Sequence, residues 1–305
     1  MKRATAFAPA SIGNLAVGFD LLGGAIDGIG DRATVERNES GTVTITSITG
    51  VVTDLPLDPA ANTAGRALLG LCELRPGIGF QLSLDKGIAL GSGMGGSAAS
   101  AVAALLAANA TLSVPVSPME LYDLALLGEA VASGSVHGDN VAPSLLGGIV
   151  LAPSSGAPVR VPVPTLLWTA ICHPHMVLST REARAALKGE YALSSFVEQS
   201  EGLALVLAGC YTNDLSLIKR GLRDVLVEPR RASLIPGFAD VKQAALAAGA
   251  LGASISGAGP SLFAWFDGKQ AAERGAQAMS DAFSTVGLAS DRYVSPAAAP
   301  GARVE

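Results

Sequence analysis

A run of glycines near residue 90 is the most chemically specific feature of this 305-residue sequence. Residues 87–99 read Gly-Ile-Ala-Leu-Gly-Ser-Gly-Met-Gly-Gly-Ser-Ala-Ala. Glycine accepts backbone conformations that turn successive N–H groups toward one point. The apolar residues after Ser97 predict a helix, whose N-terminus favours an anion. The geometry suits a polyphosphate, although glycine richness alone is equally compatible with a flexible turn or tight helix packing. The stretch is neither a Walker A motif nor GxGxxG followed by an acidic residue.

Two side chains with oxygen atoms are placed to hold a metal ion beside this loop. Ser97 stands at the predicted helix start, and Glu129 lies near the end of a second apolar helix. Mg²⁺ takes oxygen ligands and usually sits between one or two protein oxygens and nucleotide phosphates. A carboxylate in an apolar helix needs a partner or a metal. The alternatives are an N-cap role for Ser97 and an exposed last-turn position for Glu129.

Alternating and periodic patterns predict the elements that position these residues. Strands are expected at 42–46, 80–84, 167–171, near 253 and at 262–266. Helices are expected at 97–109, 118–133, 241–248 and after Ser179, where Glu182 completes a capping box. Strands and helices mix without strict alternation, which favours an α+β fold. The Pro- and Ser-rich patch 153–164 predicts two domains, 1–155 and 156–305, and the Ala/Pro tail 297–302 is expected to fray.

Composition excludes several classes of function. A net charge of −5 and a pI near 5.3 argue against a nucleic-acid partner, which needs a basic surface. The longest apolar stretch, 98–110, is too short for a membrane span, and Pro9 and Gly13 interrupt any signal-peptide pattern. Three cysteines without CxxC spacing fit a reducing compartment, so we expect a cytoplasmic protein.

Three segments together resemble the GHMP kinase superfamily. They are residues 9–20 (Pro-Ala-Ser-Ile-Gly-Asn-Leu-Ala-Val-Gly-Phe-Asp), the glycine loop, and residues 254–261 (Ser-Ile-Ser-Gly-Ala-Gly-Pro-Ser). Their order and spacing cover nearly the whole chain. Within the superfamily, the chain is most similar to the homoserine kinase branch, on four stretches: 14–20, which is part of the first segment, 135–143, 180–184 and 228–231.

The resemblance implies a two-domain GHMP kinase fold and a transfer of phosphate from ATP to L-homoserine. The N-terminal domain would be like ribosomal protein S5 domain 2, and the C-terminal domain ferredoxin-like. The nucleotide-binding residues implied are Asn62, Gly91, Ser92, Gly93, Met94, Gly95, Gly96 and Ser97, with Mg²⁺ on Ser97 and Glu129. The substrate-binding residues implied are Asn14, Asp20, His137, Asn140, Arg184, Arg231 and Gly257. A homodimer is a further expectation from the resemblance.

The chemistry of L-homoserine is compatible with these residues. Arg184 and Arg231 can bind its carboxylate, at least one of them bidentately, and Asp20 can accept from its ammonium. Asp20 is also the candidate general base, and Asp20, Glu129 and Arg184 form the expected catalytic set. The alternatives are solvated arginines, a turn role for Asp20 and an ordinary hydrogen-bonded loop role for His137.

Two departures from the family pattern affect the site. Gly96 replaces the first serine of the usual Gly-Leu-Gly-Ser-Ser, which removes one hydroxyl but keeps Ser97. Residues 12–16 read Ile-Gly-Asn-Leu-Ala where Ser-Ala-Asn-Leu-Gly is common, which leaves Asn14 in place but bears on the local backbone conformation. A kinase for another small alcohol and a non-catalytic ligand sensor on the same fold are the competing functions.

Overall fold

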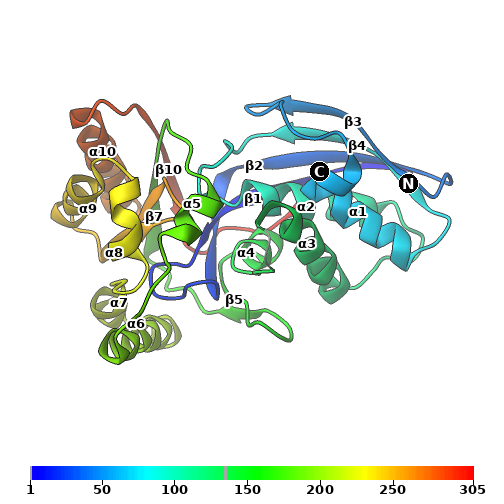
Figure 1. The fold of residues 1–305 in the computed structure, drawn as a ribbon. Helices are drawn as coiled ribbons and strands as arrows, with labels where there is room; N and C mark the ends of the chain where they lie inside the picture. Colours follow the sequence, from blue (N-terminus) through cyan, green and yellow to red (C-terminus); the bar gives the residue numbers. More distant parts are fainter. Residues whose placement is uncertain (1, 134–135) are drawn as a thin grey trace.

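The computed structural model describes residues 2–133 and 136–305. Two β-sheets lie side by side, each with its own helices (Figure 1). The first sheet has the strand order β11-β1-β2-β4-β3, with β5 and β6 continuing from β2. Its strands are β1 (Arg3–Gly13), β2 (Leu22–Asn38), β3 (Val43–Gly50), β4 (Gly79–Lys86), β5 (Ile149–Leu151), β6 (Val159–Val161) and β11 (Arg303–Val304). Among the strands that the structure describes, only β3 and β4 pair in parallel, and α1 connects them in sequence.

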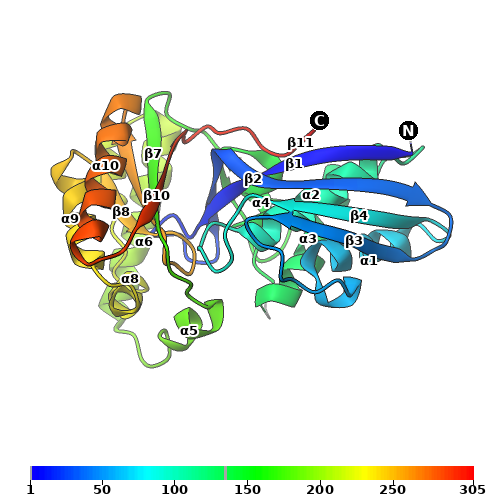
Figure 2. The same cartoon turned by 90° about the horizontal axis from the view of Figure 1, so that it is seen from above.

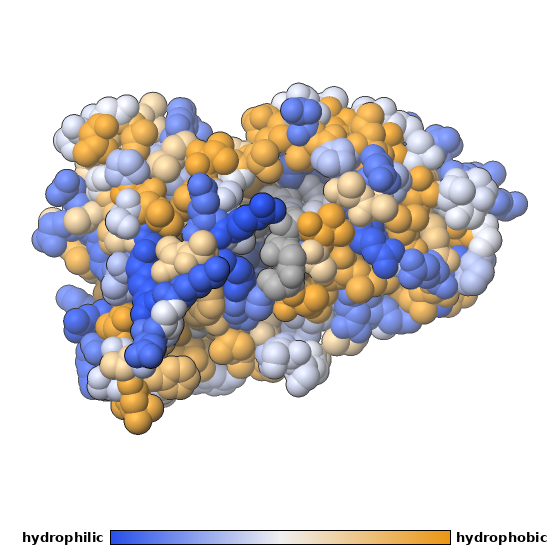
Figure 3. Space-filling view, viewed as in Figure 1, coloured by the Kyte–Doolittle hydropathy of each residue, from blue (hydrophilic) through white to orange (hydrophobic). Residues whose placement is uncertain are grey.

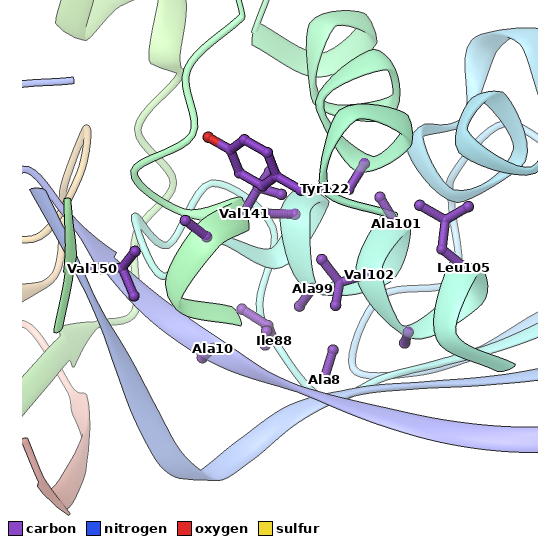
Figure 4. Close-up of a cluster of buried hydrophobic side chains, with 14 of the residues drawn as sticks. Ala8, Ala10, Ile88, Ala99, Ala101, Val102, Leu105, Tyr122, Val141 and Val150 are labelled. Carbon is purple, nitrogen blue, oxygen red and sulfur yellow. The ribbon is translucent and has the colours of Figure 1, made fainter. Parts of the chain in front are cut away.

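Helices cover one face of this sheet, as Figure 2 shows from above. They are α1 (Thr63–Leu74), α2 (Gly96–Ala110), α3 (Pro118–Ser133) and α4 (Val141–Leu146), with a short 3₁₀ turn at Pro59–Ala61. Helix α2 is made almost entirely of Ala, Val and Leu and is buried between β1, β2 and the other helices. Figure 4 shows Ala99 and Val102 of α2 on the side of the helix toward Ala8 of β1, within one cluster of buried hydrophobic side chains. This packing fixes the helix that begins at the glycine loop.

The second sheet is antiparallel, with the order β10-β7-β9-β8. Its strands are β7 (Leu167–Pro174), β8 (Gly252–Ile255), β9 (Leu262–Asp267) and β10 (Ser290–Pro296). Helices α9 (Phe238–Ala247) and α10 (Lys269–Thr285) pack on it through their apolar sides. The strand order 4-1-3-2 with two crossover helices is that of a ferredoxin-like domain. The remaining helices are α5 (Thr180–Ala185), α6 (Leu193–Thr212), α7 (Leu215–Gly221) and α8 (Glu228–Arg231), with a 3₁₀ turn at Ala232–Leu234.

The elements predicted from local patterns are confirmed, with two capping boxes among them. Glu120 N donates to Ser117 Oγ and Ser117 N to Glu120 Oε2, and Ser179 and Glu182 form the same arrangement. The long strands β1 and β2 and helices α6 and α10 were not anticipated. The patch 153–164 contains the short strand β6, which pairs with β5 of the first sheet; the division at residue 155 stays a prediction.

The expectation of a frayed tail is wrong. Ala297 and Ala299 are buried, and β11 pairs with β1 in the first sheet. Backbone hydrogen bonds from Gly148 N to Ala299 O and from Ala302 N to Ser144 O hold the tail on the way. A chain whose backbone groups pair and whose small side chains are buried is ordered despite its low-complexity composition.

Candidate active site

A cavity of about 480 Å³ contains every site residue predicted from the sequence. It lies between the half built on the first sheet and the half built on the second, and Figure 3 shows a hollow there with hydrophilic side chains on its left and mostly hydrophobic ones on its right. Its lining comes from the glycine loop 88–97, the segment 177–180 and the turn 257–259, together with Asn14, Asp20, Asn62, Glu129, His137, Asn140, Arg184 and Arg231. Its volume is in the range of small-molecule sites.

The glycine loop ends in a helix N-terminus that has no side-chain cap. Gly91, Gly93 and Gly95 have φ values of 62°, 77° and 66°, which favour glycine. Gly95 is the N-cap residue of α2 and supplies no hydrogen-bonding side chain. The first N–H groups of a helix have no partner within it and, with the helix dipole, favour an anion. The loop therefore fits a phosphate chain better than it fits a packing turn.

A buried ion pair holds both ends of this loop. Lys86 lies beside Asp31, and its ammonium group also donates to Gly96 O at 2.9 Å and to Ser100 Oγ at 2.7 Å. Asp31 Oδ1 accepts from the backbone N–H groups of Gly87 and Ile88, at 3.0 and 3.2 Å. The three polar groups therefore join strand β2, the loop entry and the first turn of α2.

The turn 254–261 holds the middle of the loop from the second sheet. Ser256 Oγ donates to Gly93 O at 2.7 Å, and Ser261 Oγ donates to Ser92 O at 2.6 Å. His173 of β7 approaches Ser261 Oγ through Nδ1 at 3.1 Å. The third family segment thus contacts the loop directly, which its sequence alone did not reveal.

Ser97 and Glu129, which both line the cavity, are joined by a hydrogen bond. Ser97 Oγ donates to Glu129 Oε2 at 2.6 Å, so the N-cap alternative for Ser97 is wrong. Burial raises the pKa of Glu129 to about 7, opposed by the hydrogen bond from Ser97. A desolvated carboxylate next to a hydroxyl oxygen, at the start of a phosphate-type helix, fits a hard cation with oxygen ligands.

Charged side chains cluster at the other end of the cavity. Arg184 donates to both carboxylate oxygens of Asp20, at 3.1 and 3.2 Å, and His137 Nε2 lies 3.5 Å from Asp20 Oδ2. Arg231 is buried, with donor bonds to Ala183 O and Gly257 O. The solvated-surface alternative is wrong for Arg231, and Arg184 is ion-paired. Burial and the neighbouring Arg184 lower the pKa of Arg231.

Asn14 organises the Asp20 turn through its side chain. Its Oδ1 accepts from Asp20 N at 2.9 Å, and its Nδ2 donates to Gly257 O at 2.9 Å. Asn14, Leu15 and Ala16 have successive positive φ values of 71°, 39° and 63°. Ala16 therefore adopts a left-handed conformation where the family commonly has glycine. The departure in the first motif leaves Asn14 in the cavity wall.

Comparison with known proteins decides which family this site belongs to. The GHMP kinases N terminal domain model matches residues 62–148, and the GHMP kinases C terminal model matches residues 206–285. A homoserine kinase from Xanthomonas campestris pv. campestris is 57% identical over all of this chain and 94% of that protein. One from Xylella fastidiosa is 55% identical over 99% of this chain and 94% of that protein. The chain belongs to the homoserine kinase family of the GHMP kinases.

A solved structure shows the same fold at high similarity. The homoserine kinase from Cytophaga hutchinsonii superposes with a TM-score of 0.95 at 43% identity, covering 100% of this chain and 98% of that one. The two-domain GHMP kinase fold expected from the sequence is confirmed, and members of this family of small-molecule kinases use ATP. In the part of the chain that the structure describes, no helix is long and apolar enough to cross a membrane.

Two asparagines of this homoserine kinase fold use their amides to shape the cavity. Asn62 caps α1 by accepting from Ala64 N and Gly65 N, and it donates to Pro56 O. Asn140 Oδ1 accepts from Ser11 Oγ at 2.9 Å. Ser135 of the same family segment lies outside the described residues.

Asp139 is one of the cavity residues that the sequence did not assign to the site. Its carboxyl group accepts from Asn14 N at 3.2 Å, and burial together with the nearby Asp20 charge raises its pKa to about 7. In the sequence the only signal for Asp139 is its position between His137 and Asn140, and the fold shows that its side chain is buried. In this homoserine kinase family member the cavity thus holds one ion-paired and one largely desolvated aspartate.

Proposed function

We propose that this protein transfers the γ-phosphoryl group of ATP to the side-chain hydroxyl of L-homoserine. The observation that carries the proposal is that one cavity is lined by both kinds of site. It joins an uncapped glycine-loop helix start at one end to the Asp20–Arg184 pair and Arg231 at the other. A phosphate site and an amino-acid site in one cavity are what such a reaction requires. The names of the 55–57% identical relatives support the same assignment.

The nucleotide end is proposed to use the loop backbone and the wall near Asn62. Gly91 to Ser97 would surround the phosphates, and the apolar residues Leu55 and Leu90 line the same cavity as Asn62. Gly96 adds no hydroxyl there, so Ser97 supplies the side-chain oxygen of this turn. The buried Lys86 contributes positive charge beneath the same turn, although its donors are already engaged.

Mg²⁺ is proposed to bind between Ser97, Glu129 and the phosphates. The residues fit because both side chains supply oxygen atoms and Glu129 is desolvated enough to favour a neutralising cation. Within the described residues no group of three or more His, Cys, Asp or Glu side chains could hold a metal by itself. The phosphates would therefore complete the ligand set, and the ion would neutralise their charge during transfer.

At the substrate end, the charged side chains are proposed to bind the ammonium and carboxylate groups of L-homoserine in place of the contacts they make with each other. Asp20 would accept from the ammonium group, while Arg184 and the buried Arg231 would bind the carboxylate. Arg184 Nε is buried and makes no hydrogen bond within the described residues, so it offers a donor. His137, Asn14, Asn140 and Gly257 complete the walls of this subsite.

The transfer step needs alignment more than covalent help from the protein. The hydroxyl oxygen forms a bond to the γ-phosphorus as the bond from phosphorus to the β,γ-bridging oxygen breaks, and ADP leaves. The hydroxyl proton must depart, and Asp20 is the proposed acceptor because its carboxylate lies in the substrate subsite. Positioning and charge neutralisation supply most of the acceleration in such reactions.

An ADP-release assay with L-homoserine, mevalonate, galactose and shikimate tests the proposal. We expect turnover with L-homoserine and at most weak turnover with the others. Absence of turnover with L-homoserine would overturn the assignment. An unchanged L-homoserine KM in Arg184→Ala would favour another small alcohol, and nucleotide binding without any turnover would favour a ligand sensor. A cytoplasmic location, which the cysteine pattern predicts, and a homodimer, which the family resemblance predicts, stay proposals; light scattering would measure the oligomeric state.

A further inference from the structure

The segment that carries Arg184 has little packing of its own. Of the six residues of α5 only Ala183 is buried, and residues 184–192 contain no buried side chain. In Figure 2, α5 lies apart from the strands of the second sheet. Apolar burial is the main source of order in a folded chain, so this segment needs other contacts to be held in place.

Arg230 supplies such contacts to the turn that follows α5. Its Nη1 donates to Lys188 O at 2.7 Å and to Leu187 O at 3.4 Å, and its Nη2 donates to Glu190 O. The guanidinium also stacks on Tyr191, 3.8 Å from the ring centre. Three carbonyl groups from four consecutive residues thus point at one cation. Leu187 O also accepts from the Tyr191 hydroxyl at 2.8 Å, but Arg230 is the positive charge that all three carbonyl dipoles share, so its loss should loosen the turn.

Arg231, the next residue of α8, holds the other side of Arg184. Its Nε donates to Ala183 O at 3.0 Å, and its Nη1 donates to Gly257 O at 3.0 Å. Arg231 therefore binds the carbonyl of Ala183, and Arg230 binds carbonyls in the turn 187–190. Arg184 lies between these two attachment points in the sequence. From there its guanidinium reaches Asp20 and lies 5.8 Å from the centre of the Phe19 ring.

Helix α8 is itself rigidly attached, so it can serve as the support. Asp224 accepts from the N–H groups of Leu226, Val227 and Glu228, each at 2.9 Å. Glu228 is buried, accepts from Ser254 Oγ at 2.7 Å and forms an ion pair with Lys242. These bonds tie α8 to β8 and α9 of the second sheet.

We propose that Arg230 is a positioning residue for the amino-acid subsite. By closing the turn 187–190 it sets the place of Arg184, which binds the substrate carboxylate. The inference rests on the proposed function, since it assigns Arg230 to the same reaction. It also explains the otherwise unused arginine of the segment Glu228-Pro229-Arg230-Arg231.

Kinetics of Arg230→Ala and Arg230→Lys test the proposal, with the exposed Arg274→Ala of α10 as the matched control. We expect Arg230→Ala to raise the KM for L-homoserine at least tenfold and to leave the KM for ATP within twofold of the parent. Lysine cannot donate to three carbonyls from a planar fork, so Arg230→Lys should recover only part of the loss. An unchanged KM for L-homoserine in Arg230→Ala would overturn the proposal.

A double-variant cycle separates positioning of Arg184 from general support of the fold. In an Arg184→Ala background, Arg230→Ala should change kcat/KM for L-homoserine by less than twofold, because no guanidinium remains to be positioned. Equal losses in both backgrounds would show that Arg230 acts independently of Arg184. Measurements in the linear, low-substrate range keep the weak variants quantifiable.

Limited proteolysis with trypsin tests the clamp without relying on activity. Cleavage after Lys188 should be faster in folded Arg230→Ala than in the parent or in Arg274→Ala, as followed by mass spectrometry. Equal cleavage rates would contradict the clamp. If the parent protein does not turn over L-homoserine, the proposed function fails, while this measurement still decides whether Arg230 holds the turn.

Discussion

At the scale of single residues, two aspartates of the cavity, Asp20 and Asp139, lie in different environments. Asp20 is ion-paired with Arg184, whereas Asp139 is buried and has its pKa raised to about 7, first by desolvation and then by Asp20. Asn14 contacts both residues: its Oδ1 accepts from the backbone N–H of Asp20, and its own backbone N–H donates to Asp139 Oδ2. Carboxyl groups whose environment shifts their pKa are concentrated at functional sites.

The raised pKa of Asp139 predicts a pH-dependent contribution to stability. In the unfolded chain this carboxyl ionises near its ordinary value of about 3.9, whereas the folded protein keeps it protonated up to about pH 7. The stability it contributes is therefore complete below the unfolded pKa and is lost as the pH rises through about 7. Asp139→Asn keeps an oxygen that can accept from Asn14 N. Its unfolding temperature relative to the parent should be higher at pH 8 than at pH 5.

Thermal unfolding of both proteins at the two pH values measures this difference. The exposed Asp54→Asn serves as the control and should show no such change. A difference between Asp139→Asn and the parent that is the same at pH 5 and pH 8 would contradict the assignment of a raised pKa to Asp139.

Glu129→Gln tests the proposed metal site. The substitution keeps the size of the side chain and an oxygen that can accept from Ser97, but it removes the negative charge. We expect kcat to fall by about 100-fold or more, because the phosphate charge would be less well neutralised. ADP release measured across a range of Mg²⁺ concentrations checks this, with Glu39→Gln on the surface as the control. Full activity in Glu129→Gln would remove this residue from the site.

At the scale of elements, the glycine loop depends on partners that are distant in sequence. Strand β2 reaches the loop through Asp31, β4 through Lys86, and the turn after β8 through Ser256. Hydrogen bonds that pin carbonyl groups of Ser92 and Gly93 toward the second sheet help to set how the remaining loop backbone faces the cavity. The loop is therefore a junction between both halves of the molecule.

Gly93→Ala should disturb nucleotide binding in particular. At Gly93 an added Cβ would lie 2.5 Å from Ser256 O, and φ is +77°. At Gly77, in the turn before β4, φ is +87° but nothing lies within 4 Å. Both substitutions force a left-handed alanine, at a cost of about 1 kcal/mol, but only Gly93→Ala must also shift the loop. We expect the KM for ATP to rise at least about tenfold in Gly93→Ala and to stay unchanged in Gly77→Ala.

Steady-state kinetics and chemical denaturation of the two glycine variants provide the check. If Gly93→Ala and Gly77→Ala lose the same stability and both keep the parent KM for ATP, the loop does not need its observed backbone path.

At the scale of the whole molecule, the C-terminal segment connects the two sheets. After β10 of the second sheet, the chain returns to the first sheet, where Glu305 N donates to Thr5 O at 2.9 Å and β11 lies beside β1. Both termini accordingly lie on the first half of the molecule in Figure 1. Because the segment runs from β10 of the second sheet to β1 of the first, it couples the stability of the two sheets.

Removal of residues 297–305 should destabilise the fold. The deletion exposes the partners of buried Ala297 and Ala299 and breaks several backbone hydrogen bonds, each worth about 1 kcal/mol. We expect the unfolding temperature to fall by at least about 5 °C. Glu305→Gln breaks only the exposed ion pair with Arg32 and should shift it by less than about 1 °C. Calorimetry on the three proteins compares them, and an unchanged midpoint after the deletion would show that the segment adds no stability.

Short-range patterns in the sequence were enough for the local elements and the type of chemistry. Helix α2, strand β4 and both capping boxes follow from composition and spacing within a few residues. The glycine loop with Ser97 and Glu129 indicated phosphate and metal chemistry, and resemblance to known kinases supplied the substrate. Local patterns did not predict strands β1 and β2, because the length of these strands depends on the strands with which they pair.

Only the tertiary structure decided how groups far apart in sequence share one environment. Asp139 is a polar loop residue in the sequence, and its burial against Asn14 and Asp20 raises its pKa. In the sequence Arg230 resembles an exposed cation, but the fold brings the carbonyls of Leu187, Lys188 and Glu190 to it. The physical reason is that desolvation and carbonyl dipoles act over a few ångströms in space. The sequence determined which groups were available, and the packing of the two halves determined which of them meet.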